Sequence, residues 1–321
     1  MLHYILGDIM NKYDVLKEYY GYDDFRGIQE ECIDSILEGN DTICVMATGG
    51  GKSVTFQIPG LMLDGLTLVI SPLISLMNDQ VLNLKKIKVC AGTINSNTDE
   101  YEESNVIKDI KAEKLKFLYL SPERLLNPKY EKLLLECNIS QLVLDESHCL
   151  SQWGHDFRPS YFKIIDFIKK IAKKPIISCF TATADDLVIK DIKEALNINP
   201  KIFKSNFDRP MLYYETIRCK DKKMFIFDFI AKHNDVAGII YTLTRKNTEH
   251  LYQFIKEKGF KVSMYHGGLE DDVKRKNQNE FLEGKTMIMV ATNSFGLGVN
   301  IILYIICVYL LIDLNDFFYA Y

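Results

Sequence analysis

Two adjacent carboxylates, Asp145 and Glu146, follow the apolar run 142–144, and His148 stands two positions beyond them. The apolar run is typical of the end of a buried strand. Open α/β sheets place their chemistry at the carboxyl ends of strands, where loops gather side chains from several elements. The paired acids therefore predict a catalytic site at one edge of a sheet.

A polar loop with aromatic and cationic side chains comes directly after the acids. It contains the only Trp of the chain, Trp153, together with Gln152, His155, Phe157 and Arg158. Such side chains suit a ring-shaped or polyanionic ligand. We expect the stretch 142–161 to join a catalytic site to a nucleic-acid sensor.

A glycine-rich loop lies between a short apolar strand at 41–46 and a helix that runs through Gln57. Consecutive glycines let backbone N–H groups curl around phosphate oxygens, because no Cβ stands in the way. Lys52 would reach the β- and γ-phosphates and the Ser53 hydroxyl would hold Mg²⁺, beside the partial positive charge of a helix N-terminus. The predicted ATP-binding residues of the loop are Thr48, Gly49, Gly50, Gly51, Lys52 and Ser53.

The strict G-x-x-x-x-G-K-[ST] pattern is not met, since Met46 stands where its first Gly would be. A glycine-rich turn with a chance Lys is the alternative, but the strand–loop–helix context favours a phosphate-binding loop. With that loop granted, the two acids acquire separate roles. Asp145 would complete the Mg²⁺ coordination and Glu146 would polarise the attacking water, so Lys52, Asp145 and Glu146 are the predicted catalytic residues.

The segment 20–29 places aromatic rings, a guanidinium and a carboxamide close together. Tyr22 and Arg26 could sandwich a purine while Gln29 reads its hydrogen-bonding edge, since an amide offers both donors and an acceptor. A surface helix start with ordinary packing aromatics is the alternative on spacing alone. Tyr22, Arg26 and Gln29 are the predicted base-binding residues of the ATP site.

Strand-like and helix-like runs alternate along the chain, which is the pattern of a parallel sheet covered by helices. Strands are expected at 41–46, 66–70, 88–94, 116–120, 142–144, 175–180, 237–241, 261–265 and 286–290, and helices at 72–84 and 99–112 among others. Ser71 and Ser121 each precede a Pro at a strand end, which is ordinary helix capping, although free helix N-termini also suit backbone phosphates. The predicted fold class is α/β.

The composition is that of a globular protein with no global basic field. The 321 residues are 47% hydrophobic and carry a net charge of -4, so a nucleic acid would have to bind in a local groove. Eight cysteines without zinc-type spacing indicate free thiols in a reducing compartment. The start of the chain has no signal-peptide pattern, and the apolar run 301–312 is shorter than the roughly 20 residues of a membrane span. We expect a cytoplasmic protein without a zinc site.

Taken together, these segments resemble the RecQ family of superfamily 2 DNA helicases over about residues 20–300. The resemblance rests on FR-x-x-Q (25–29), MxTGGGKS (46–53), SPLISLMxDQ (71–80), SPERL (121–125), the DExH box (145–148), HCxSQWGHDFRPxY (148–161) and FTATA (180–184). Two positions depart from it. Ser147 replaces the usual Ala, and Gly27-Ile28 replaces the usual Pro-Gly.

The resemblance implies two tandem RecA-like P-loop NTPase lobes, 1–205 and 206–321. It also implies a 3′-to-5′ translocase that uses ATP and Mg²⁺ on single-stranded and partly duplex DNA, at the chromosome, in repair and recombination. The residues that it assigns to DNA contact or to coupling are His148, Gln152, Trp153, His155, Phe157, Arg158, Thr242, Arg245, His266 and Thr292. For the four in the second lobe, ordinary packing and capping is an equal alternative.

The resemblance stops after Asn300, where the family continues through a strand to a QxxGRxGRxG motif whose arginines reach the γ-phosphate. Residues 301–321 contain no Arg and no Lys. We therefore expect an incomplete second lobe with an aberrant apolar tail from about 301, as in a truncated or frame-disrupted copy. The rival functions are a non-catalytic ATP- and DNA-binding remnant and a small-molecule kinase with the same phosphate loop.

Overall fold

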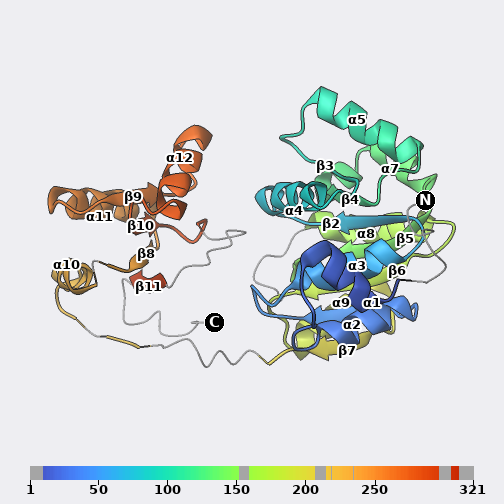
Figure 1. The fold of residues 1–321 in the computed structure, drawn as a ribbon, viewed down its shortest axis with the longest axis horizontal. Helices are drawn as coiled ribbons and strands as arrows, with labels where there is room; N and C mark the ends of the chain where they lie inside the picture. Colours follow the sequence, from blue (N-terminus) through green and yellow to red (C-terminus); the bar gives the residue numbers. More distant parts are fainter. Residues whose placement is uncertain are drawn as a thin grey trace. The chain divides into compact units, whose positions relative to one another are not determined.

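The computed structural model describes residues 10–151, 159–206, 215–217, 219–233 and 235–295, and the backbone of 305–310. The chain divides into two compact units, residues 1–209 and 210–321, and each is built on its own sheet (Figure 1). None of the helices in the described ranges is long and apolar enough to cross a membrane.

The first unit contains, among the described residues, a seven-stranded sheet in the order β3-β4-β2-β5-β6-β1-β7. Every pairing in it is parallel. The strands are β1 (Thr42–Val45), β2 (Leu66–Ile70), β3 (Ala91–Ile94), β4 (Phe117–Leu120), β5 (Ile139–Leu144), β6 (Ile176–Thr181) and β7 (Lys201–Lys204). Because all strands run the same way, the segments after β1, β5 and β6 leave the sheet at one edge.

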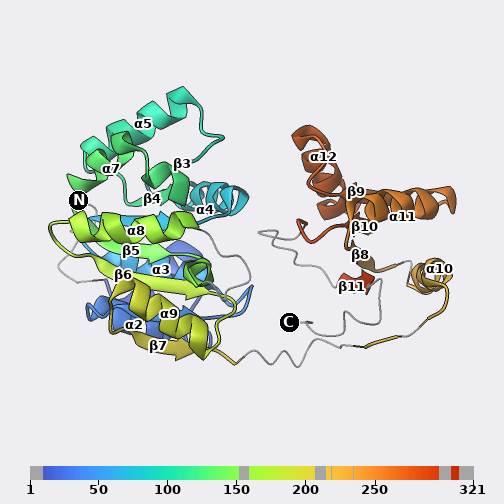
Figure 2. The same ribbon diagram turned by 180° about the vertical axis from the view of Figure 1, so that it is seen from behind.

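Helices cover both faces of this sheet, so its central strands are apolar on both sides. One face packs on α1 (Lys12–Val15), α2 (Gln29–Leu37), α3 (Lys52–Met62) and α4 (Ile74–Lys86). The other packs on α5 (Glu100–Lys111), α6 (Pro122–Leu125), α7 (Pro128–Leu135), α8 (Pro159–Lys170) and α9 (Asp186–Leu196). Figure 1 shows α1 to α3 in front of the sheet, and Figure 2 shows α8 and α9 there.

Alternation along β1 shows how one strand serves both layers. Ile43 and Val45 belong to the core under α8 and α9, whereas Cys44 belongs to the core under α1 to α4. Successive side chains of a strand point to opposite faces. The apolar run 42–45 is therefore buried throughout, which holds the start of the glycine-rich loop on a rigid element.

The second unit has a four-stranded parallel sheet in the order β11-β8-β10-β9 among the described strands. Its strands are β8 (Ala237–Thr242), β9 (Val262–Tyr265), β10 (Ile288–Ala291) and β11 (Ile305–Leu310). Its helices are α10 (Lys222–Lys232), α11 (Arg245–Glu257) and α12 (Asp271–Leu282). Apolar clusters lie on both faces of the sheet, one with α10 and α11 and one with Phe281 of α12.

β11 lies inside the apolar run that the sequence alone marks as an aberrant tail. It pairs in parallel with β8 in continuous register, from Ile305 opposite Ala237 to Leu310 opposite Thr242. Residues 305–310 are therefore an integral strand of the second sheet. A continuous apolar run is the expected composition for a strand of a parallel sheet.

The element bounds differ from the sequence prediction at a few places. β7 is missing from the prediction, because the sequence of Lys201–Lys204 is half lysine and its side chains are mostly exposed. The helix expected at 72–84 begins at Ile74 instead. The strand expected at 88–94 begins at Ala91, since Lys88 adopts a left-handed backbone with φ of 61° that ends the preceding turn.

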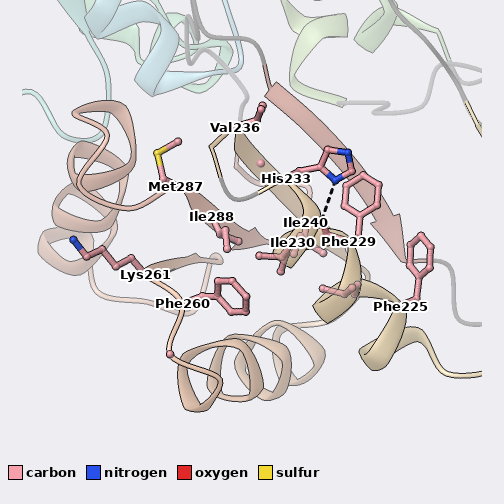
Figure 3. A pocket seen from close by; sticks show the side chains of 13 residues that line it. Phe225, Phe229, Ile230, His233, Val236, Ile240, Phe260, Lys261, Met287 and Ile288 are labelled. Atoms are coloured by element: carbon pink, nitrogen blue, oxygen red, sulfur yellow. Dashed lines mark hydrogen bonds between the residues drawn. The ribbon is translucent and has the colours of Figure 1, made fainter.

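An apolar cavity of about 230 Å³ lies in the second unit beneath α10, near the amino ends of β8 and β10. Figure 3 shows Phe225, Phe229 and Ile230 of α10 facing Phe260 and Ile288. His233 closes the α10 side, where its Nδ1 lies 2.9 Å from the Phe229 carbonyl oxygen. Aromatic and branched side chains thus line the cavity and leave part of its volume unfilled.

We predict that Gly60→Ala destabilises the first unit although Gly60 lies inside α3. Alanine normally stabilises a helix interior by about 0.5–1 kcal/mol relative to glycine. Here an added Cβ would lie 2.7 Å from Phe117 Cε1 and 2.7 Å from Thr67 Oγ1, so overpacking by about 1–3 kcal/mol should win. Urea unfolding followed by circular dichroism measures the change, with the exposed Ser75→Ala as control. Equal or higher stability of Gly60→Ala would contradict the tight packing of α3 on the sheet.

Candidate nucleotide-binding and hydrolysis site

The glycine-rich loop leaves β1 with a conformation that requires glycine. Gly49 and Gly51 have φ of 81° and 83°, in the left-handed region that favours glycine. A Cβ on Gly51 would also collide with the Gln29 side-chain amide. Met46, which replaces the first Gly of the strict pattern, is buried and donates its backbone N–H to the Thr181 carbonyl oxygen at 3.0 Å. The loop then opens α3, whose first two residues are Lys52 and Ser53.

Gln29 connects the base-binding element to this loop. Its Oε1 accepts from the Arg26 backbone N–H at 2.8 Å, and its Nε2 donates to the Gly50 carbonyl oxygen at 3.2 Å. The Arg26 guanidinium lies 5.3 Å from the centre of the Tyr22 ring. Two groups that stack on both sides of a purine must lie about 7 Å apart, because each makes a carbon contact of about 3.5 Å with the base. Tyr22 and Arg26 therefore stack on each other here, and a purine between them would require their separation.

Asp145 ends β5 as a buried carboxylate with several partners. Its backbone N–H donates to the Ile70 carbonyl oxygen at 2.9 Å, and the Tyr161 hydroxyl donates to its carbonyl oxygen at 2.8 Å. The Ser71 hydroxyl donates to Oδ2 at 3.1 Å. Burial, and next the negative charge of Glu146, raises the pKa of the carboxyl to about 6. The site thus holds a carboxylate whose charge is poorly compensated, which is the condition that a cation would relieve.

Glu146 follows in a left-handed backbone conformation, with φ of 49° and ψ of 46°. This conformation costs about 1–3 kcal/mol for a residue other than glycine, and it turns the carboxylate toward the phosphate loop. Lys52 Nζ lies 3.5 Å from Oε1, and His148 Nδ1 lies 3.3 Å from Oε2. Burial would raise the pKa of Glu146, but the hydrogen bond with His148 and the charge of Lys52 outweigh it, so that the pKa lies below its ordinary value.

His148 links the acids to the strand end of β6. Its Nδ1 also lies 2.9 Å from the Thr181 hydroxyl oxygen. Because that hydroxyl donates its own proton to the Thr183 carbonyl oxygen at 2.9 Å, Nδ1 must carry the proton that is shared with Thr181 and Glu146. The segment 180–184 is therefore connected to Glu146 through one imidazole.

The oxygens predicted to hold Mg²⁺ converge on one small cavity. Ser53 and Asp145 line it together with Ser71 and Gln80, and its volume of about 10 Å³ is about the least that admits one water. Mg²⁺ is bound in such sites by one or two protein oxygens, several waters and the phosphates of the substrate. A hydroxyl and a carboxylate that face one cavity beside a phosphate loop fit this ion.

Apart from His148, which contacts Glu146 and Thr181, the DNA-contact candidates fall into two groups. Gln152, Trp153, His155, Phe157 and Arg158 lie outside the described residues. The four of the second unit gather near the carboxyl ends of β8, β9 and β10, as a parallel sheet requires: Thr242, Arg245, His266 and Thr292.

Among these four, two are buried and two are accessible. Thr242 and His266 are 4% and 3% exposed, and their polar atoms contact Thr248 Oγ1 at 2.6 Å and the Gly268 N–H at 3.2 Å. Arg245 begins α11 and is exposed, and its guanidinium lies against Gly268. The Thr292 hydroxyl is 2.8 Å from Ser294 Oγ. Arg245 and Thr292 are therefore accessible to a ligand, whereas Thr242 Oγ1 and His266 Nδ1 have structural partners. The buried His266 Nε2 has no hydrogen-bond partner among the described residues and lies 3.4 Å from Glu249 Oε1.

Sequence reasoning missed the residues that hydrogen-bond to Asp145 and to the Ser53 hydroxyl. Ser71 entered it only as a helix cap, and Gln80 and Tyr161 only as letters of a family motif. Ser71 lies 74 positions from its partner Asp145, and Tyr161 lies 16 positions from the same residue. Gln80 lies 27 positions from its partner Ser53. Only the recurrence of polar residues at strand ends signalled that Ser71 could face the acids.

A phosphate loop after β1, acids at the end of β5 and a second parallel sheet define a P-loop NTPase with two RecA-like units. The DEAD/DEAH box helicase model matches residues 26–192, and the helicase conserved C-terminal domain model matches residues 221–311. The chain belongs to the DEAD/DEAH box helicase family and is a RecQ-type member of it. The second match extends beyond Asn300 and includes β11.

Known relatives and solved structures agree with this placement. The chain is 40% identical over 288 residues to the ATP-dependent DNA helicase RecQ of Bacillus subtilis, covering 89% of this chain and 49% of the relative. It is 36% identical over 304 residues to that of Synechocystis sp., covering 92% and 64%. The chain thus spans about half to two thirds of these proteins.

Two solved helicases show the same fold at low identity. The DUF1998 helicase MrfA bound to DNA superposes with a TM-score of 0.72 at 18% identity, over 94% of this chain and 44% of that one. S. cerevisiae Dbp5 bound to Gle1 superposes with a TM-score of 0.71 at 20% identity, over 94% and 78%. The tandem RecA-like architecture is therefore shared well beyond the close relatives.

We predict that Asp145→Asn raises stability at neutral pH while it abolishes Mg²⁺-dependent nucleotide binding. The folded pKa of about 6 lies above the ordinary 3.8, so stability falls as the pH rises from about 4 through 6. The Asn amide does not ionise, so the variant does not lose this stability. The loss for Asp145 is about 3 kcal/mol once the carboxyl is fully ionised above pH 6. Unfolding measured between pH 4 and 8 should show an advantage that grows with pH, with the exposed Asp166→Asn as control. A difference that is constant across this range would refute the buried, uncompensated charge.

We predict that Ser147→Ala does not weaken the protein. The Ser147 hydroxyl is fully buried and has no hydrogen-bond partner among the described residues. Removing an unsatisfied buried hydroxyl should stabilise the fold by about 1 kcal/mol. Thermal unfolding measures this, with Ser121→Ala, which removes the buried N-cap of α6, expected to lose stability instead. A loss of stability in Ser147→Ala would indicate a partner for this hydroxyl.

Proposed function

We propose that the chain contains the ATP-driven motor of a RecQ-type DNA helicase, which hydrolyses ATP with Mg²⁺ and moves 3′ to 5′ along single-stranded DNA to unwind duplexes in repair and recombination. The observation that supports it most directly is the partly buried group of Lys52, Glu146 and His148 beside the Ser53–Asp145 cavity. The relatives named as ATP-dependent DNA helicases supply the expected substrate.

The geometry supports a division of labour around the γ-phosphate. Phosphates are bound by the N–H groups of the loop and by the Lys52 ammonium. Lys52 contacts Glu146 in the structure, so phosphate binding would draw this cation away and leave the carboxylate to accept a proton from the attacking water. A bound Mg²⁺ would neutralise charge on the phosphate oxygens.

The His148 contact suggests how a change at the strand end of β6 would reach the chemistry. His148 holds Glu146 Oε2 and Thr181 at once. Displacement of the segment 180–184 would therefore change the orientation and basicity of Glu146. Such a link is what ATP hydrolysis stimulated by DNA requires.

A non-hydrolysing ATP- and DNA-binding module is the second candidate. Turnover decides between them. Tight binding of ATP and single-stranded DNA without phosphate release would favour the second candidate.

We predict that Lys52→Ala lowers DNA-stimulated ATP hydrolysis by about 10²-fold or more, since it removes the cation from the phosphate site. Phosphate release is measured with and without a single-stranded oligonucleotide. Lys108→Ala, an exposed lysine of α5, is the matched control and should behave as the unmodified chain. ATP hydrolysis that persists unchanged in Lys52→Ala would reject the phosphate-site assignment.

A further inference from the structure

A directed chain of side-chain hydrogen bonds runs beneath the phosphate loop. The Tyr20 hydroxyl donates to Gln57 Oε1 at 2.9 Å, and Gln57 Nε2 donates to Gln80 Oε1 at 2.9 Å. Gln80 Nε2 then donates to Ser53 Oγ at 2.6 Å. The chain joins α3 to α4, since Ser53 and Gln57 belong to the first and Gln80 to the second.

Gln57 is the branch point of this chain of hydrogen bonds. Gln57 is 3% exposed, and its Nε2 also donates to the Tyr119 hydroxyl at 2.8 Å. An amide has one oxygen that accepts and one nitrogen that donates, so the Gln57 and Gln80 amides are coupled, and in the structure Gln80 presents its Nε2 to Ser53. At Ser53 the hydroxyl receives a hydrogen bond, keeps its own proton and retains one lone pair.

The segment 71–80, which contains Gln80, also hydrogen-bonds to the second predicted metal ligand, Asp145. Ser71, the residue after β2, is 2% exposed and donates to Asp145 Oδ2 at 3.1 Å. Ser71 and Gln80 thus bracket the segment 71–80, and each donates one hydrogen bond to one of the two oxygens. All four side chains line the same cavity of about 10 Å³.

We propose that Gln80 and Ser71 are positioning residues for Mg²⁺: they orient the Ser53 hydroxyl and the Asp145 carboxylate so that both present a free lone pair to the cavity. This inference rests on the proposed function. The residues that surround metal ligands typically change metal affinity by 10–100-fold when they are removed. The segment 71–80 therefore sets the magnesium requirement for nucleotide binding, and any ligand that displaces it would change that requirement.

The test is a magnesium titration of nucleotide binding in the full chain. A fluorescent, non-hydrolysable ATP analogue is titrated at increasing Mg²⁺ and again in EDTA. Gln80→Met keeps the length of the side chain without its amide, and Ser71→Ala removes one small hydroxyl. Both should raise the half-saturating Mg²⁺ concentration by about 10-fold, while binding in EDTA stays as in the unmodified chain.

The matched control is Asn78→Ala, which removes an amide of α4 that bonds Asn95 Nδ2 at 3.1 Å and does not line the cavity. It should leave the magnesium titration unchanged. A purely structural role of Gln80 predicts a lower melting temperature with the same half-saturating Mg²⁺, and that result would overturn the proposal. Ser71→Ala gives an independent answer should Gln80→Met fail to fold. If the unmodified chain binds no nucleotide, the proposed function itself fails. If it binds nucleotide but the variants show the same half-saturating Mg²⁺ concentration, only the role of Gln80 and Ser71 fails.

Discussion

Two adjacent carboxylates at the end of β5, Asp145 buried and Glu146 partly buried, impose the main constraint on the first unit. A buried charge is unfavourable unless partners compensate it. Glu146 has Lys52 and His148 as partners, whereas Asp145 receives only neutral donors and keeps a pKa of about 6. The first unit thus keeps an unfavourable buried charge at its candidate site, a trade between stability and function that is often seen at functional sites. The left-handed backbone at Glu146 adds further strain at the same point.

The hydrogen-bonding side chains around the acids fix the positions of the two carboxylates. They come from β2, α3, α4, β6 and α8, because the parallel sheet brings all of these elements to one edge or to the layer beneath it. A buried polar network specifies one arrangement when all its members are satisfied. Ser147 is the exception, since its buried hydroxyl has no partner in the described part of the chain.

Much of this could be predicted from the sequence, and the remainder has physical reasons. Strands of four or more apolar residues, such as β2 and β6, are evident because burial on both faces demands continuous hydrophobicity. The phosphate loop is evident despite Met46, because glycine positions with positive φ leave a local signature. β7 is not, since a lysine-rich edge strand has no such signature. The contacts of Ser71 and Gln80 join residues far apart in sequence, and only the fold brings them together.

Two of the four edge strands in the described sheets, β7 and β11, differ in a way that matters for handling the protein. β7 ends the first sheet with Lys201 and Lys204, and charged side chains of this kind discourage a further strand from pairing with an edge. β11 lies at the edge of the second sheet among the described strands, and its sequence IICVYL has no charge, no proline and no glycine. Such an edge is a template for strand addition, whether by another segment or by a second molecule. Among the described strands, β11 therefore lacks the charged side chains that protect β7 from strand pairing.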